Sequence, residues 1–314
     1  MHIQFYNARG HDRALEAKDL AKVRLTADSL LWINGTADEI EALKLPIAIG
    51  GAVASCRPGK ADVRVHDAHY CVALPVLDKG GTASTSLLSL VVGQDWLCSV
   101  GDGEAADFSG LLRHDVGETM KGKLSGSTLA AALIADHFGR VHERVAVINR
   151  EIDRMEERVL TGRESRNTLQ VMAVLRRQAS RLRELVDAYR AIVHTLNRPD
   201  FLPDMASEDK NHFAHLQAGY ERLEDDVARV RDTVVASFEL YATRVAQDTN
   251  RLLRTLTFFT IGIGLIGALA GIFGMNFKAA LFERGESGFA LATAAMASIL
   301  LATTAVAFRS YRKP

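Results

Sequence analysis

Asn276 is the residue whose position most directly suggests chemistry. It follows Gly274 and Met275 at the end of an apolar stretch, residues 256–273, that contains no charged side chain. A hydrated divalent cation such as Mg²⁺ holds its waters tenaciously in an octahedral shell. Neutral amide oxygens and backbone carbonyls can accept hydrogen bonds from those waters without trapping the ion among carboxylates. The triplet therefore suits an ion filter, and the competing structural role for Asn276 is a C-terminal helix cap.

An ion filter needs a water-filled path that leads to it. One face of the helix expected before Gly274 could line such a path. Steps of three and four residues back from Gly271 mark the side that would line such a path. Because two membrane helices cannot enclose a water-filled path, the path requires several copies of the chain. Gly267 and Gly271 also match a helix-packing motif of membranes, so pore lining and packing are both open. The predicted pore-lining residues are Asn250, Leu253, Leu256, Thr260, Gly264, Gly267 and Gly271.

Two apolar stretches are long enough to hold these residues in a bilayer. Residues 256–273 and 288–308 carry no charge, and each approaches the roughly 20 residues that cross the hydrocarbon core. Two buried helices of a soluble core are the alternative, which uncharged stretches this long and this close together disfavour. We predict a first transmembrane helix at 256–275, a periplasmic loop at 276–287, a second transmembrane helix at 288–308 and a tail at 309–314.

Basic residues flank the two stretches on the sides away from the loop. The loop itself has acidic residues that offset its basic ones. The positive-inside rule then predicts an inner (plasma) membrane protein with both termini in the cytoplasm. The flanking basic residues are Arg244, Arg251 and Arg254 before the first stretch and Arg309, Arg312 and Lys313 after the second.

The residues before the membrane part predict a soluble portion with strands first and long helices after. Strand-like segments occur at 2–7, 29–33, 69–77, 85–92 and 94–100, and a short helix is expected at 38–43 with Thr36 as its cap. We predict a cytoplasmic α/β domain over 1–125, whose strand order the sequence leaves open. The fold class is therefore an α+β membrane protein.

The helical part has apolar residues at steps of three and four from Ser127 onward. Thr161 and Gly162 interrupt the pattern, which predicts a helical hairpin over 126–200. A third helix, the stalk, is expected over 204–255, with an apolar phase that reaches Val245. No proline separates it from the first apolar stretch. A helix from residue 211 to 275 would be roughly 95 Å long, which suits a stalk that continues into a bilayer.

Other chemistry finds little support. The net charge is zero, so no basic excess points to nucleic acid. The cysteines form no Cys-x-x-Cys pair, which predicts neither a zinc finger nor a disulfide framework. No nucleophile–base constellation or phosphate loop is present, so we predict neither an enzyme nor a cofactor. Three histidine pairs lack a third metal ligand at zinc-site spacing and are expected to be solvated or capping residues: His66 and His69, His137 and His142, and His212 and His215.

The triplet at the end of the first apolar stretch, with a second stretch just after it, resembles the CorA family of divalent cation transporters. Residues 247–250 followed by Leu256-Thr257 resemble the family's entry into the membrane, where an asparagine lines the inner pore. Residues 87–100, with Gly93 and Asp95-Trp96, are similar to paired strands of its cytoplasmic domain. Trp32 followed by Asp38-Glu39 resembles a pattern that the family has early in its sequence. The resemblance implies a homopentameric funnel with the first spans around the pore and the second spans outside.

Some positions depart from the family. The family usually has a bulky apolar residue near Gly264, so Leu253 and Leu256 would form the main hydrophobic ring here. In the loop, Lys278 opposes the cation attraction expected of Glu283 and Glu286.

The resemblance implies transport of Mg²⁺, or also Co²⁺ or Ni²⁺, gated by intracellular cation bound at Asp232 and Glu239 on the stalk. A ZntB-like Zn²⁺ transporter and a transport-inactive membrane scaffold of the same fold are the alternatives.

Overall fold

The computed structural model describes residues 1–7, 12–26, 28–43, 45–56, 60–77, 85–101, 108, 125–162, 167–202, 207–274 and 285–312. The chain falls into two compact units, which are described one after the other. The first comprises Met1–Arg158 and Glu164–Ser237, and the second comprises Val159–Arg163 and Phe238–Pro314.

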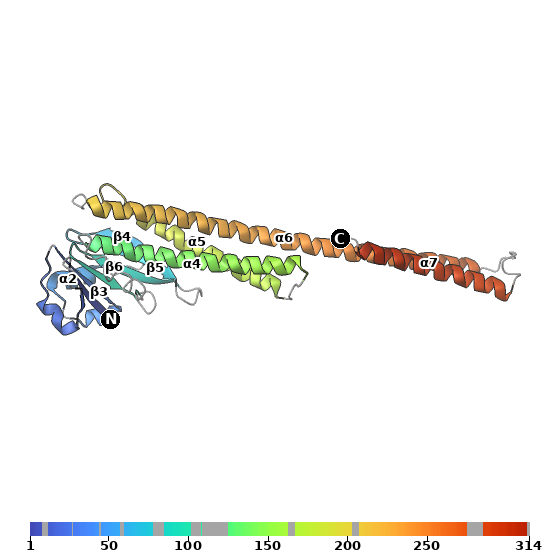
Figure 1. Ribbon diagram of the computed structural model, residues 1–314, viewed down its shortest axis with the longest axis horizontal. Coiled ribbons are helices and arrows are strands. Elements are labelled where there is room, and N and C mark those ends of the chain that lie inside the picture. The colour runs from blue at the N-terminus through green and yellow to red at the C-terminus, as the bar shows by residue number, and fades with distance from the viewer. Residues whose placement is uncertain are drawn as a thin grey trace. The chain divides into compact units, whose positions relative to one another are not determined.

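The first unit is built on a mixed sheet (Figure 1). Its strands lie in the order β2-β1-β3-β7-β6-β5-β4. Strands β3 and β7 pair in parallel, and the other neighbours pair antiparallel. All five predicted strand segments contain a strand, whereas β2 and β4 were not predicted. The strands are β1 (His2–Asn7), β2 (Arg13–Ala14), β3 (Ser29–Gly35), β4 (Asp62–Val65), β5 (Tyr70–Leu77), β6 (Thr85–Val92) and β7 (Trp96–Val100).

The central strands are apolar because both faces of the sheet are covered. All seven residues of β3 are buried, as expected for a strand between two layers. Side chains alternate between the faces, so Leu31 and Ile33 join one core while Leu30 and Trp32 point to the other. The first core also takes in residues of β5, β6 and β7 and of three short helices: η1 (Ala17–Lys22), α1 (Ala37–Glu41) and α2 (Ile47–Ser55).

The short helix predicted near residue 38 is confirmed as α1. Thr36 caps it by accepting a hydrogen bond from the backbone N–H of Glu39, and the Glu39 carboxylate accepts one from the backbone N–H of Thr36. This reciprocal pair satisfies donors that a helix start otherwise leaves free. The helix α2 was not predicted.

The second face of the sheet is covered by the long helix α5 (Thr168–Leu196), which contacts β4 and β5. The long helices α4 (Gly126–Leu160) and α6 (Ser207–Gly274) pack against α5, through the Phe138 and Tyr189 rings and through the Arg190–Tyr220 hydrogen bond. On this face, Trp32 Nε1 donates to Ser99 Oγ at 2.9 Å, and Ser99 Oγ donates to Asn34 Oδ1 at 2.8 Å. Tyr70 OH donates to Ser127 Oγ at 3.1 Å and so ties β5 to the first turn of α4. Burial raises the pKa of the Tyr70 phenol.

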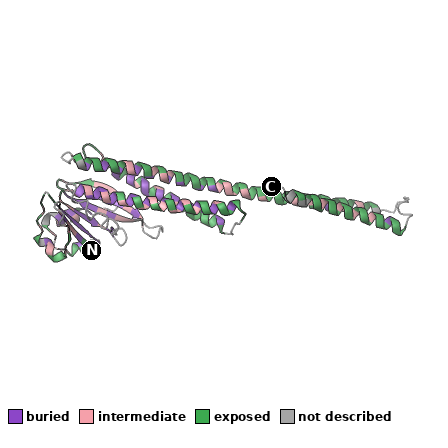
Figure 2. Ribbon diagram, in the orientation of Figure 1, coloured by how far each residue is buried: buried purple, intermediate pink, exposed green. Residues whose placement is uncertain are grey.

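The predicted apolar stripes of the three helices are their buried faces (Figure 2). The hairpin break is also confirmed, because α4 ends at Leu160 and Gly162 adopts a left-handed φ of 68°. On α6 the buried stripe extends through Val234 to Ser237. The apolar phase continues to Val245 as predicted, but Val245 lies beyond the buried stripe and is 41% exposed in the single chain. Apolar spacing alone does not reveal where the partner helices end.

A buried carboxylate joins the starts of α4 and α6. Asp209 Oδ1 accepts hydrogen bonds from Ser125 Oγ at 2.6 Å and from Thr128 Oγ1 at 2.8 Å. Ser125 Oγ in turn accepts from the backbone N–H of Thr128 at 3.0 Å. The negative charge thus lies at the positive end of the α4 dipole, where it is favourable.

Replacing Asp209 with alanine should lower the free energy of unfolding of the first unit by about 2–3 kcal/mol, because hydrogen bonds to a buried charge are lost and two hydroxyls lose their acceptor. Urea unfolding followed by tryptophan fluorescence measures this, since Trp32 and Trp96 both lie in this unit. Glu221→Ala, on the exposed side of the same helix, is the matched control with an expected loss below about 0.5 kcal/mol. Equal losses of unfolding free energy in Asp209→Ala and Glu221→Ala would show that the hydrogen bonds of Asp209 add no stability.

The second unit contains the C-terminal part of α6 and the helix α7 (Glu286–Arg312). Helix α6 is continuous to Gly274, as the lack of proline predicted. Near its entry into the apolar stretch, Asp248 pairs with Arg244 at 3.4 Å and with Arg251 at 3.8 Å. Two of the predicted flanking arginines are therefore held on the helix surface.

Candidate functional site

The apolar parts of α6 and α7 are exposed along their length (Figure 2). Only 6% of the apolar window of α6 and none of that of α7 is buried. A core helix of a soluble protein would be mostly buried, and a signal sequence would lie near the N-terminus. Neither description fits these helices, so they are candidate membrane spans. Exposed Leu256, Ile263 and Leu301 are typical of surfaces that face lipid or other chains.

One face of α6 packs on α7 within the chain. A Cβ atom added at Gly262 would lie 2.8 Å from Thr303 Oγ1 and 3.1 Å from Thr303 Cβ, so the contact requires glycine. Less exposed residues recur at three- and four-residue steps along the same side of each helix. They are Thr255, Phe258, Gly262, Ile266 and Leu269 on α6 and Gly288, Ala292, Met296, Ile299 and Thr303 on α7.

The predicted pore-lining residues lie on the other side of α6. Gly264 follows Gly262 by two residues, and two residues turn a helix by about 200°. A Cβ atom added at Gly264, Gly267 or Gly271 would have no neighbour within 4 Å among the described residues. All seven predicted positions, from Asn250 to Gly271, are exposed. The glycine stripe therefore does not pack on this chain's own α7, and it is open to water or to another copy.

The polar groups within the span are satisfied by the helix itself. Thr260 Oγ1 donates to Leu256 O at 2.9 Å, and Thr257 Oγ1 donates to Leu253 O at 2.8 Å. Such bonds leave the hydroxyl oxygen free to accept another one while its hydrogen stays paired, as membrane helices require. Thr260 on the predicted stripe thus offers an oxygen acceptor rather than a donor.

The predicted filter begins at the last residue of α6. Gly274 ends the helix and is exposed, whereas Met275, Asn276 and Glu283 lie outside the described residues. Glu286 is the first residue of α7 and is exposed. A carboxylate at a helix N-terminus is stabilised there by the helix dipole.

The predicted regulatory carboxylates lie on the surface of α6. Asp232 and Glu239 are seven residues apart, about two helical turns, and both are exposed. Neither forms an ion pair with any residue in the described part of the chain. Both are therefore solvent-exposed charges on the helix surface.

The chain matches a family model described as "CorA-like Mg2+ transporter protein" over residues 57–309. The chain belongs to the CorA family. Its similarity to two curated relatives, each named "Cobalt/magnesium transport protein CorA", is 29% identity over 172 residues for the Thermotoga maritima protein and 24% over 169 residues for the Methanocaldococcus jannaschii protein. These alignments cover 55% and 54% of this chain but only 47% and 53% of the relatives, which is about half of their length.

Solved structures share the fold of this CorA protein over nearly all of its length. The complete CorA magnesium transporter from Methanocaldococcus jannaschii superposes with a TM-score of 0.73 at 18% identity, covering 98% of this chain and 97% of the other. Full-length CmaX gives 0.67 at 18%, covering 99% and 97%. The ZntB cytoplasmic domain from Vibrio parahaemolyticus gives 0.57 at 10%, covering 78% and 98%. The fold class predicted from the sequence is thereby confirmed.

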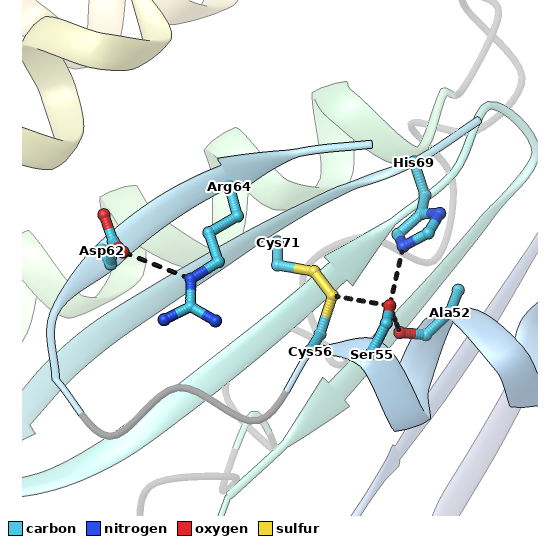
Figure 3. The surroundings of a disulfide bond; sticks show 7 residues. All are labelled: Ala52, Ser55, Cys56, Asp62, Arg64, His69 and Cys71. Carbon is cyan, nitrogen blue, oxygen red and sulfur yellow. Dashed lines mark hydrogen bonds and ion pairs between the residues drawn. A yellow bond between two sulfur atoms is a disulfide. The ribbon is translucent and has the colours of Figure 1, made fainter. Parts of the chain in front are cut away.

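Three of the histidine and cysteine predictions for this CorA protein were wrong. The sequence indicated no disulfide and no further ligand near His66 and His69, which was wrong on both counts. Cys56 and Cys71 are joined as a disulfide (Figure 3), and ligand atoms of these cysteines and of both histidines lie within 4.8 Å of one another. This group of two cysteines and two histidines was not predicted, because its members are brought together by tertiary packing and form no local sequence motif.

The other histidine pairs form no such group within the described residues. His142 Nδ1 lies 3.0 Å from Asp226 Oδ2, and His212 and His215 are exposed. His137 was predicted to be solvated or capping, which was wrong, because it is buried beside the Phe108 ring. Its Nε2 has no hydrogen-bond partner among the described residues. Burial, helped by the nearby positive charge of Arg140, lowers the pKa of His137 to about 3.

His137 should make the first unit lose stability as the pH falls from about 6.5 towards 3. The unfolded chain binds a proton near its ordinary pKa of 6.5, whereas the folded chain resists protonation until about 3, so acid favours unfolding in this window. Between pH 7 and pH 5 the expected loss is about 2 kcal/mol. Urea unfolding at a series of pH values should show a shallower loss for His137→Leu and an unchanged one for exposed His194→Ala.

Proposed function

We propose that this CorA protein conducts divalent cations through a membrane path formed by several copies of α6, with homopentamers as the assembly. The observation that carries the proposal is the free stripe on α6. One side of the helix is occupied by α7 of the same chain, while the opposite side is exposed from Asn250 to Gly271. That side leads to Gly274, and the Met275-Asn276 pair follows directly.

The arrangement of faces supports first spans inside and second spans outside. A chain whose α6 turned its Gly262 face to the axis would bring α7 into the path, because Thr303 contacts Gly262. Turning the stripe to the axis instead leaves α7 on the lipid side. The exposed apolar residues of α7, such as Leu291 and Leu301, then face hydrocarbon.

The donor set of the proposed path suits a hard cation that keeps its water. The stripe offers amide, hydroxyl and backbone oxygens at Asn250, Thr260 and the Gly274–Asn276 triplet, and it contains no cysteine, histidine or carboxylate. Oxygen acceptors match Mg²⁺, whereas soft ligands would favour Zn²⁺. We therefore propose Mg²⁺ as the main ion, with Co²⁺ and Ni²⁺ passing by the same contacts. A ZntB-like Zn²⁺ transporter is the alternative.

Gating is proposed to depend on intracellular cation bound at Asp232 and Glu239. Both carboxylates are exposed and unpaired within the described chain, so like charges from neighbouring copies would repel one another unless a cation bridges them. Bound cation would hold the copies together and the path closed, and its loss would release them. Because the bound cation is intracellular, the first unit must lie in the cytoplasm, and the loop between α6 and α7 must lie outside the inner membrane.

Reconstitution into liposomes tests the proposal. The purified chain should take up Mg²⁺ and Co²⁺ under an inside-negative potential, and a pH gradient should change neither rate. Uptake of Zn²⁺ alone, with dependence on the pH gradient, would replace the Mg²⁺ assignment by the ZntB-like one. Assembled protein that transports no divalent cation above empty liposomes would overturn the transport proposal and leave a membrane scaffold as the function.

A further inference from the structure

Four side chains that can bind metal converge in the N-terminal unit, far along the sequence from the proposed ion path. Cys56 directly follows α2, His66 and His69 belong to the turn between β4 and β5, and Cys71 lies in β5. Their ligand atoms all lie within 4.8 Å of one another. Cys56 and Cys71 are buried, and the two histidines are half-buried.

The turn between β4 and β5 presents both histidines to the cysteines. The backbone N–H of His66 donates to His69 O at 2.8 Å and closes the turn. The imidazole rings stack with centroids 4.6 Å apart. His69 and Cys71 are two residues apart in extended chain, so they share one face of the hairpin. Ser55 Oγ at the end of α2 lies 3.3 Å from His69 Nε2 (Figure 3).

An unsatisfied polar atom points to a missing partner. His66 Nε2 is buried, and it has no hydrogen-bond partner among the described residues. Leaving a buried polar atom without a partner is unfavourable, because the atom has lost its hydrogen bonds to water. A bound cation would satisfy a ring nitrogen of each histidine and both sulfurs together.

The chemistry of the donor set selects the metal. Two cysteine sulfurs and two histidine nitrogens are the ligands of tetrahedral structural zinc sites. Mg²⁺ takes oxygen ligands in an octahedron and would be a poor fit. The third cysteine, Cys98, is not in the group, and burial raises the pKa of its thiol to about 12.

We propose that the N-terminal unit, with Cys56 and Cys71 reduced, binds one Zn²⁺ through Cys56, His66, His69 and Cys71. This site is separate from the proposed ion path and does not depend on transport. Bound Zn²⁺ would join the end of α2 to the β4–β5 hairpin and so hold β4, the strand at the edge of the sheet. In the oxidised chain the Cys56–Cys71 disulfide joins the end of α2 to β5 instead.

The change from disulfide to metal site has a simple balance. A phosphine reductant gives two electrons to the S–S bond and becomes a phosphine oxide, with water supplying the oxygen atom and the two protons of the resulting thiols. Each thiol then loses its proton when its sulfur binds Zn²⁺. The histidines bind through neutral ring nitrogens and lose no proton.

The test uses the full-length chain in detergent, treated with a phosphine reductant and a chelator and then loaded with Zn²⁺ or Co²⁺. The wild type should retain about one Zn²⁺ per chain after gel filtration, even with excess Mg²⁺ present. Its Co²⁺ form should show sulfur-to-cobalt charge-transfer absorption. The Cys56→Ser/Cys71→Ser variant should lose the absorption and weaken Zn²⁺ binding by more than about 100-fold.

His212→Ala/His215→Ala is the matched control, because it removes an exposed histidine pair with the same spacing as His66 and His69. It should bind Zn²⁺ as the wild type does. Reduced wild type that retains no Zn²⁺, or a Co²⁺ form without charge-transfer absorption, would overturn the proposal whether or not the serine variant folds. The same holds if thiol labelling finds Cys56 and Cys71 still joined after reduction.

Discussion

Replacing Asn276 with alanine should abolish divalent cation flux in liposomes while the protein stays folded and assembled. The proposed filter offers the amide oxygen of Asn276 from each copy to the waters of the passing ion. At about 0.5–1.5 kcal/mol for each lost hydrogen bond, a pentameric ring loses at least about 2.5 kcal/mol. That corresponds to a drop of at least about 60-fold in ion occupancy of the filter. Uptake of Mg²⁺ by reconstituted protein measures it.

The control separates the filter from general damage to the spans. Thr293→Ala removes an exposed polar group of α7 whose one hydrogen bond among the described residues goes to the carbonyl of Phe289 at 2.9 Å, so flux should be unchanged. Asn276→Ala protein that transports at the wild-type rate would show that Asn276 serves as a helix cap and not as the filter. Size-exclusion chromatography of both variants checks that assembly is retained.

Local periodicity explains why the long helices could be predicted. On α5, for example, Leu175, Leu182 and Tyr189 recur at heptad spacing, and all are buried. A helical stripe is encoded by neighbours in sequence, so it can be read without knowing the partner. The central strands were recognisable because burial on both faces requires continuous apolar runs, as in β3.

The elements that were missed depend on contacts between distant residues. Strand β4 is short and half of it is exposed, and it forms because β5 supplies its hydrogen bonds. Helix α2 is apolar on all sides and has two adjacent glycines, so it shows no helical stripe. The convergence of Cys56 with the β4–β5 turn follows from the packing of α2 on the sheet, which no spacing rule contains.

The candidate ion path likewise has one part that the sequence predicts and one part that depends on contacts between distant residues. The stripe from Asn250 to Gly271 was predicted by helical steps, but its relation to α7 was not. The contact of Gly262 with Thr303 decides which side of α6 remains free, and no pattern in the sequence distinguishes Gly262 from the other glycines of the span. The assignment of the stripe to the pore stays a prediction.

The variants Gly262→Leu and Gly264→Leu, only two residues apart, should therefore have different effects. The first should impair assembly, and the second should impair cation flux. Gly262→Leu would force a side chain into Thr303, where even a Cβ atom would lie 2.8 Å from Oγ1. Overpacking of this kind costs about 1–3 kcal/mol in each chain. We expect separation of α7 from α6, a lower melting temperature of the detergent-solubilised assembly and loss of the oligomer.

Gly264→Leu should leave the assembly intact and reduce flux by at least about tenfold, because it adds an apolar ring to the proposed path and favours a dewetted, closed constriction. Both variants gain the same helix propensity over glycine, so their difference reports position alone. Melting temperature and Mg²⁺ uptake measured together on each variant separate packing from conduction. The contrary result is that Gly264→Leu lowers the melting temperature as much as Gly262→Leu does and leaves flux per assembled protein normal. That result would make the stripe a packing surface between copies, and the ion path would have to lie elsewhere.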